Sequence, residues 1–373
     1  MTFLKSFFNT IKLLYGERNK FLWVLMVVLP VLTSLFMISL LSAETPTNLP
    51  IGIVSFDDSA LSRKLERAIQ ANPVLEIKIK CPDLNSCEKE MQAGRVQAVL
   101  LFPPGMEAKS LRLEAPLISV YTNTQSLLIS NIVLKELRET LGAAGAKFSE
   151  FNVDDMLFVK VESVGNPAGN YIGFLGINLI VAVFHLCAML IGTYLASWPF
   201  RTKKVSAWIQ GASGSRLMAI FGAILPGVFI VWVEFLVLYF YTHTFFAPIH
   251  LPQLWMTALG QWMMVVACFG MGMVFAGVTG SMRVASSLTG IIGGPAFAFT
   301  GQTFPLLAMP LCVQCFAFLL PLTPLLQLQS ALLLGPVGLP AAWHSFVLLS
   351  GMAAFWLLLG TLALYWQMGR QHD

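Results

Sequence analysis

The chain has 373 residues, of which 56% are hydrophobic and only 11% are charged, and its formal net charge is +4. Soluble globular proteins carry about 25% charged residues, so the composition argues against that class and predicts an integral membrane protein. Residues 42–170 hold 16 of the 19 acidic and 13 of the 23 basic residues. This block therefore reads as a water-exposed domain inserted into apolar sequence.

The first apolar run covers residues 21–41 and contains 21 uncharged residues, enough to cross a bilayer as a helix. Pro30 in its middle predicts a kink, which membrane helices tolerate. A cleaved signal peptide is the alternative, but the run is longer than a typical signal core and LSAET is a poor cleavage site. Residues 1–20 place apolar side chains on one helical face and lysines on the other. This pattern favours a cytoplasmic amphipathic helix in the membrane interface over a simple extension of the span.

Residues 42–170 read as a mixed α/β extracytoplasmic domain. Strand patterns lie at 50–56, 74–80, 96–102 and 116–123, and helix patterns lie at 59–72, 81–94 and 125–145. Such alternation implies at least some parallel strand pairing. The acidic neighbours Asp57–Asp58 and Asp154–Asp155 are interpreted as turns or caps, because adjacent strand residues point to opposite faces. In an oxidising compartment, Cys81 and Cys87 form either a disulfide or two unpaired thiols.

Further apolar runs bring the number of predicted transmembrane helices to six, and they lie at 171–198, 217–241, 254–279, 284–300 and 343–368. Residues 301–342 are also apolar, but six prolines interrupt them. Short helices dipping into the outer leaflet fit this segment better than a seventh span.

The positive-inside rule orients these spans. The N-terminal segment carries four basic residues, which predicts a cytoplasmic N-terminus and places residues 42–170 outside. Alternation then puts residues 199–216, residues 280–283 and the C-terminus inside. The outer segments 242–253 and 301–342 contain no basic residue, in agreement with this orientation.

Motifs for catalysis are missing from the sequence. It contains no phosphate loop of the form GxxxxGK[ST], no HExxH and no GxSxG, and its five histidines do not cluster at metal-ligand spacing. Cys312 and Cys315 form a CxxC without a second pair or a histidine cluster. We therefore expect no enzyme activity, no metal, no bound cofactor and no nucleic-acid binding.

Glu234 stands out because it is an acid within the apolar run 217–241. An intramembrane acid is costly and is a functional candidate. Its candidate roles are contact with a substrate, proton coupling or a hydrogen bond to a neighbouring helix, and a structural role is the alternative. Small residues gather in two other stretches, where we interpret four glycines as close helix contacts: Gly270, Gly272, Gly293 and Gly294.

Several features together resemble a known family. A basic amphipathic segment precedes one span, the strand in PIGIVSFDDSALSRKLERAI leads to Asp57, and a GxxxA pattern begins GRVQAVLLFPPG at Gly94. Five spans follow, with a proline-broken segment before the last. This layout resembles the permease subunits of type-2 ABC exporters, in the subfamily with a large extracytoplasmic domain between spans one and two.

The resemblance implies a multi-pass protein of the bacterial inner membrane with both termini in the cytoplasm. Two permease subunits, identical or homologous, would form the translocation pathway, and a separate ATP-binding subunit would bind and hydrolyse ATP. A periplasmic membrane-fusion adaptor and an outer-membrane channel are further implied partners, beside the membrane lipids. The family exports drugs, lipids and glycans, and no residue pattern selects among them.

In that family, the loop between spans two and three carries a short helix that docks on the ATPase. The resemblance assigns this role to residues 199–216, with two apolar anchors and several basic contacts. The residues concerned are Arg201, Lys203, Lys204, Trp208, Ile209 and Arg216. The acids, the Gly-Thr and the later proline of the family pattern are missing here. The chain could therefore be a partner in a heterodimer whose other permease carries the coupling helix, or the loop could be a topology determinant alone.

Two other functions stay open from the sequence. One is a membrane-anchored scaffold or binding protein that recruits a periplasmic adaptor without forming a pathway. The other is an ion-driven transporter, which is disfavoured because the sequence shows no internal repeat and few intramembrane polar groups.

Overall fold

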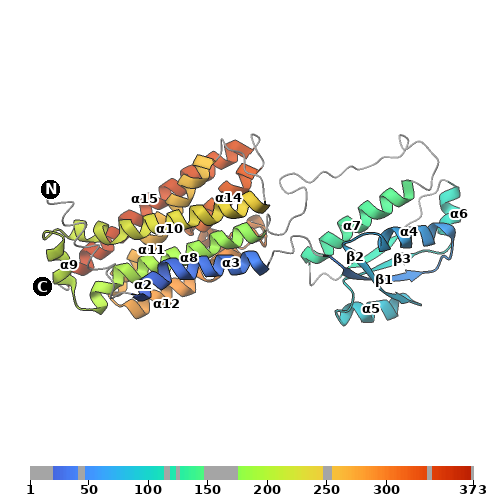
Figure 1. Cartoon of the computed structure of the whole chain (residues 1–373), viewed down its shortest axis with the longest axis horizontal. Coiled ribbons are helices and arrows are strands. Elements are labelled where there is room, and N and C mark those ends of the chain that lie inside the picture. Colours follow the sequence, from blue (N-terminus) through green and yellow to red (C-terminus); the bar gives the residue numbers. More distant parts are fainter. Residues whose placement is uncertain are drawn as a thin grey trace. The chain divides into compact units, whose positions relative to one another are not determined.

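The computed structural model describes residues 20–40, 47–112, 118–122, 127–146, 175–246, 254–333 and 338–370. The chain divides into two compact units, one formed by residues 1–44 and 162–373 and the other by residues 45–161. The first is a bundle of helices and the second is a sheet covered by helices (Figure 1). The predicted amphipathic helix before Lys20 and the pair Asp154–Asp155 lie outside the described residues.

Five helices in the described part of the bundle are long and apolar enough to cross a membrane. They are the first span with its parts α2 (Lys20–Trp23), η1 (Val24–Val28) and α3 (Leu29–Leu40), then α8 (Ile177–Arg201), α10 (Arg216–Phe246), α11 (Leu254–Thr279) and α15 (Leu339–Arg370). The pair α13 (Leu311–Leu319) and α14 (Leu322–Leu333) counts as a sixth candidate, but it is bent by 84°. These helices make the chain a multi-pass membrane protein.

The first span adapts its backbone ahead of Pro30. The N–H of Leu29 donates to the carbonyl of Val24, five residues earlier, so η1 is a π-helical turn. Proline cannot donate to the carbonyl four residues before it, and its ring crowds that carbonyl. A local π turn next to a proline is one way in which membrane helices relieve this conflict.

The prediction of a fifth span over residues 284–300 is wrong as a single helix. α12 (Met282–Gly293) has 12 residues, and the 3-10 helix η6 (Pro295–Phe299) follows it directly. Twelve residues rise about 18 Å, well short of a hydrocarbon layer about 30 Å thick. Gly293, Gly294 and Pro295 end the helix, because glycine weakens a helix and proline lacks the N–H that would extend it.

The described residues 301–333 form short helices, as predicted, whereas Leu339 already belongs to the long helix α15. The described part of this segment contains η7 (Leu306–Ala308), α13 and α14, and α15 begins at Leu339. Pro310 is the N-cap of α13, and α13 ends one residue before Leu320–Pro321. The prolines therefore set the ends of these helices.

Glycines let α11 pack closely against its neighbours in the bundle. A β-carbon on Gly270 would lie 2.5 Å from the carbonyl carbon of Trp356 on α15. On the other side, a β-carbon on Gly272 would lie 2.5 Å from the backbone nitrogen of Thr193 on α8. Only glycine permits backbones to approach so closely, which agrees with the predicted packing role of these residues.

The second unit has a four-stranded sheet in the order β2-β1-β3-β4. Its strands are β1 (Leu49–Ser55), β2 (Leu75–Cys81), β3 (Ala98–Phe102) and β4 (Ser119–Thr122). β1 pairs in parallel with β2 and β3, whereas β4 is antiparallel to β3. All four strands coincide closely with the runs predicted from the sequence.

Helices cover both faces of this sheet (Figure 1). One apolar core joins the sheet to α4 (Ala60–Gln70) and α7 (Leu127–Ala146), and a smaller core joins it to α5 (Leu84–Gln92). β1 is buried on both faces, because Ile51 and Ile53 contribute to the first core and Val54 contributes to the second. This burial is typical of a central parallel strand. The short helix α6 (Met106–Leu111) was not predicted, and it packs near α4.

A disulfide joins Cys81 at the end of β2 to Cys87 in α5, with 5.7 Å between the two α-carbons. Asp83 is the N-cap of α5, and its carboxylate accepts a hydrogen bond from the Ser86 N–H at 2.7 Å. That bond lowers the pKa of Asp83 below its usual range. Glu90 near the other end of the helix pairs with Arg95, which lowers the pKa of this carboxyl as well.

Candidate functional site

The loop between α8 and α10 carries the basic residues that the sequence singled out. α8 ends in a Schellman-type cap, in which the Lys203 N–H donates to the Phe200 carbonyl (3.3 Å) and the Lys204 N–H donates to the Pro199 carbonyl (3.0 Å). Lys203 occupies the left-handed position of this cap, with φ of 54°. The cap thus satisfies the last carbonyls of α8 and leaves two exposed lysines directly after it.

The short helix α9 (Val205–Gly211) lies against the bundle through one apolar face. Val205, Trp208 and Ile209 follow the i, i+3, i+4 spacing of such a face, and all three are buried in the core of the bundle. Trp208 is 1% exposed and Ile209 is 5% exposed. The expectation that these two residues anchor a partner is therefore corrected, because their side chains contact the core of their own chain.

The exposed face of α9 is small and polar. Ser206, Ala207 and Gln210 are exposed between the buried positions. Together with Lys203 and Lys204, they form the surface that a partner can reach, and we call these five residues the α9 surface.

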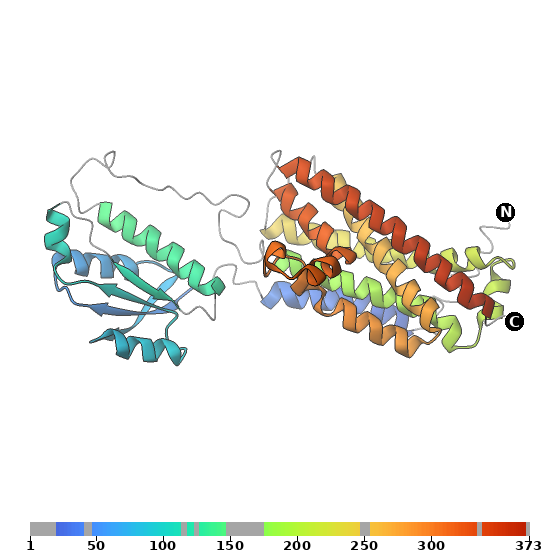
Figure 2. The same ribbon diagram turned by 180° about the vertical axis from the view of Figure 1, so that it is seen from behind.

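Cations gather at the end of the bundle that carries α9. The guanidinium of Arg216, the first residue of α10, stacks over the ring of Tyr365 in α15 at 5.1 Å. The α8–α10 loop and the C-terminal end of α15 therefore lie together, as both views of the bundle show (Figures 1 and 2). The ion pairs found in the described residues all lie within residues 58–95, so the cations at this end of the bundle have no carboxylate partner there.

Glu234 lies in α10, facing the contact between α10 and α8. Its neighbour Phe235 is buried and stacks on Phe184 of α8, with ring centroids 4.6 Å apart. Glu234 itself is partly buried and interacts electrostatically with Cys187 of α8. Its Oε2 is buried and accepts no hydrogen bond from any described residue. This oxygen therefore does not form the hydrogen bond to a neighbouring helix that the sequence left open, within the part of the chain that the structure describes.

The bundle buries many polar side chains, and the sequence reasoning did not single out three of them that have two unpaired polar atoms each among the described residues. They are His185 in α8, Gln261 in α11 and Gln329 in α14. Their side-chain nitrogens and oxygens have no hydrogen-bond partner among the described residues. Buried polar groups are normally paired, so these positions are candidates for function. Giving neutral polar residues in apolar runs the same weight as charged ones would have identified them.

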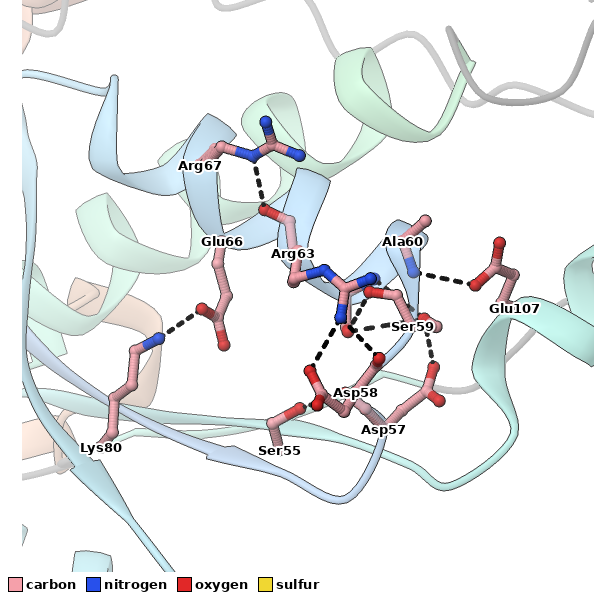
Figure 3. A network of polar contacts seen from close by, with 11 residues as sticks. Ser55, Asp57, Asp58, Ser59, Ala60, Arg63, Glu66, Arg67, Lys80 and Glu107 are labelled. Carbon is pink, nitrogen blue, oxygen red and sulfur yellow. Dashed lines mark hydrogen bonds and ion pairs between the residues drawn. The ribbon is translucent and has the colours of Figure 1, made fainter.

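The acidic pair after β1 supports the start of α4, where Ser59 is the capping residue (Figure 3). The hydroxyl of Ser59 donates to Asp57 Oδ2 at 2.7 Å and accepts from the Ser62 N–H at 3.2 Å. Arg63 donates from Nη1 to Asp58 Oδ1 at 3.0 Å. Asp57 and Asp58 are thus engaged in local structure and not in a catalytic pair.

Comparison with known protein families assigns both units of the chain to one family. A family described as ABC-2 family transporter protein matches residues 20–362 of the chain. No curated protein matches it with significant similarity. Members of the matched family are membrane components of ABC transporters and are not enzymes themselves, and the family implies partnership with an ATP-binding subunit. The match spans nearly all of the described helices and strands, and the chain belongs to the ABC-2 transporter family.

Proposed function

We propose that this chain is the permease subunit of an ATP-driven export system in the bacterial inner membrane. It forms the translocation pathway as a dimer with a second permease subunit, identical or homologous. A separate subunit binds and hydrolyses ATP, and this chain binds no cofactor. Membership of the ABC-2 family supports the permease role.

The observation that carries the proposal is the basic end of the bundle. Its described cations are Lys20, Arg201, Lys203, Lys204, Arg216, Arg283 and Arg370. Basic residues are enriched on the cytoplasmic side of membrane proteins, so this end faces the cytoplasm. The C-terminus is then cytoplasmic. Counting six spans, with the bent pair of α13 and α14 as one of them, places the N-terminus there too and residues 45–161 in the periplasm.

The ATP-binding subunit docks on the α9 surface. Lys203 and Lys204 offer charge for this contact, and Gln210 offers hydrogen bonds. Trp208 and Ile209 fix α9 to the bundle from behind. Because α9 is bound to the core and is continuous in sequence with α8 and α10, a displacement of the docked subunit moves these two helices as well.

The proposal that the chain forms a translocation pathway rests on the buried polar groups of the bundle. Glu234, His185, Gln261 and Gln329 come from α10, α8, α11 and α14, respectively. An unpaired polar group inside a membrane bundle is costly, which favours a role in passing a substrate. The periplasmic unit then offers a surface for a membrane-fusion adaptor and, through it, an outer-membrane channel.

Site-specific photo-cross-linking tests the docking contact. A photoreactive amino acid at Gln210 should capture an ATP-binding protein in cells, whereas one at exposed Lys109 of the α/β unit should not. If Gln210 and Ala207 both capture no ATP-binding protein while Lys109 captures a periplasmic protein, the scaffold function replaces the permease function.

A further inference from the structure

A cleft opens at the basic end of the bundle, between the end of α8 and the start of α12. Its volume is about 630 Å³, and Arg201, Ser281, Arg283 and Ser286 contribute its polar lining. Arg201 is the last residue of α8, and Arg283 is the second residue of α12. Two segments that are 81 residues apart in sequence, at Arg201 and Met282, thus form one site.

The charge of this cleft is positive and is not neutralised by the described residues. Both arginines are exposed, and no acidic residue lines the cleft. The Nη1 of Arg201 donates to the sulfur of Met282 at 3.6 Å. This sulfur is neutral, so the charge of Arg201 stays uncompensated. The acid that the structure describes in the bundle unit is Glu234, which lies mid-way along α10.

Hydrogen-bond donors add to this charge. α12 begins next to the cleft, and its N-cap Ser281 makes no side-chain capping bond. The first backbone N–H groups of a helix have no partner within the helix, and they favour a negative group. The hydroxyls of Ser281 and Ser286 are further donors at the same place.

The walls of the cleft are held in position by contacts deeper in the bundle. Thr193 of α8 and Thr289 of α12 share a buried hydrogen bond, with their hydroxyl oxygens 2.8 Å apart. A β-carbon on Gly293 of α12 would lie 2.9 Å from Leu186 of α8, so the two helices are in close contact there as well. A cleft between helices fixed in this way is preorganised for a ligand.

We propose that this cleft binds the phosphate group of an anionic phospholipid. Arginine pairs with phosphate oxygens through a planar fork of donors, and two arginines with serine hydroxyls supply such donors from both walls. The cleft lies where two apolar helices end, which is the level of the lipid headgroups. Basic pockets between membrane helices at the cytoplasmic side are known to hold anionic headgroups.

Native mass spectrometry of the full-length protein in detergent tests this site. The probes are phosphatidylglycerol, phosphatidylcholine and inorganic phosphate. We expect phosphatidylglycerol to bind most tightly, and we expect R201Q/R283Q to weaken its binding about 25-fold, at about fivefold per cation near an anionic lipid. R201K/R283K keeps both charges but loses the planar fork of donors, so its binding should fall between that of the wild type and that of R201Q/R283Q.

The matched control is K203Q/R216Q, which removes the same charge at the same end of the bundle but outside the cleft. It should bind phosphatidylglycerol like the wild type. An equal loss in this control, or no loss in R201Q/R283Q, would overturn the proposal in favour of unspecific attraction. Arginine-dependent binding of inorganic phosphate without binding of phosphatidylglycerol would overturn the lipid as the source of the phosphate. Unchanged lipid binding together with loss of a co-purifying ATP-binding protein would reassign the two arginines to protein docking.

Discussion

The backbones of Gly270 in α11 and Trp356 in α15 meet so closely that a β-carbon on Gly270 would lie 2.5 Å from the Trp356 carbonyl carbon. Neither backbone can move without shifting a whole helix. Gly270→Ala should therefore lower the free energy of unfolding by about 1–3 kcal/mol, as overpacking does in other cores. The thermal stability of the detergent-solubilised protein measures this effect.

Gly351→Ala is the matched control for this substitution. It lies in α15, the helix that Gly270 contacts, and a β-carbon there meets no atom within 4 Å. It should leave the stability unchanged or raise it slightly, because alanine favours a helix over glycine. Equal effects of both substitutions would mean that the α11–α15 contact is looser than described.

Lys203 occupies a left-handed backbone position at the end of α8. Lys203→Gly should raise the stability by about 0.5–1 kcal/mol over Lys203→Ala, because glycine adopts this conformation without the steric penalty of a β-carbon. Both variants lack the lysine charge, so the comparison isolates the backbone. Chemical denaturation followed by tryptophan fluorescence measures the difference, and a more stable alanine variant would contradict the cap geometry.

The disulfide between Cys81 and Cys87 allows a test of whether residues 45–161 face the periplasm. If residues 45–161 face the periplasm, a membrane-impermeant maleimide applied to intact spheroplasts should label these cysteines only after reduction. Cys81→Ala/Cys87→Ala should destabilise the α/β unit by about 2 kcal/mol through the lost loop closure. Labelling of Cys81 or Cys87 without a reductant would show that the bridge does not form in the cell.

Asp83 predicts a pH dependence of stability. The Ser86 N–H donates to its carboxylate, which holds the pKa of Asp83 lower in the folded protein than in the unfolded chain. The resulting stabilisation is present above the usual pKa of aspartate and is lost as the pH falls through the lowered value. The stability gap between wild type and Asp83→Asn should therefore shrink below about pH 4. Glu88→Gln is the control, because it removes a charge mid-way along the same helix at a position that caps neither end. If the stability difference between wild type and Glu88→Gln shrinks in the same way at low pH, Asp83 is not the cause.

Glu234→Gln tests the intramembrane acid. If the carboxylate contacts the substrate or carries a proton, this variant should reduce export several-fold at normal protein levels, whereas Glu234→Asp should retain part of the activity. Complementation of the phenotype of a strain lacking the gene measures export. Full complementation by Glu234→Gln would assign the residue a structural role.

The sequence predicted the elements whose pattern is local. The strands of the α/β unit follow runs of β-branched and alternating residues, and Ser59 marks the start of α4 as a capping residue should. The first span was placed to within a residue, although the π turn ahead of Pro30 was expected only as a kink. Hydropathy wrongly predicted one helix over residues 284–300, because the apolar run continues past Gly293 and Pro295, where the helix ends.

The site was harder to predict, because its parts depend on tertiary contacts. The apolar pattern of Trp208 and Ile209 is the same whether these residues contact a partner or the core of their own chain. Only the packed bundle shows that they contact their own core. The cleft between Arg201 and Arg283 joins the ends of two helices that are distant in sequence, so charge counting placed both arginines on one side of the membrane without bringing them together. The buried amides of Gln261 and Gln329 carry no charge and gave no signal in that count.

The central claim is that this chain is a permease driven by a separate ATP-binding subunit. The most direct measurement is ATP hydrolysis by the complex that co-purifies with the affinity-tagged chain from membranes of its own host. The account predicts an ATP-binding protein in stoichiometric amount, with hydrolysis that is strongly reduced in a Lys203→Glu/Lys204→Glu variant and unchanged in the matched Lys109→Glu/Arg112→Glu variant of the α/β unit. A well-folded chain that purifies without any ATP-binding protein, or hydrolysis that the α9-surface variant leaves intact while cross-links from Gln210 are missing, would contradict it.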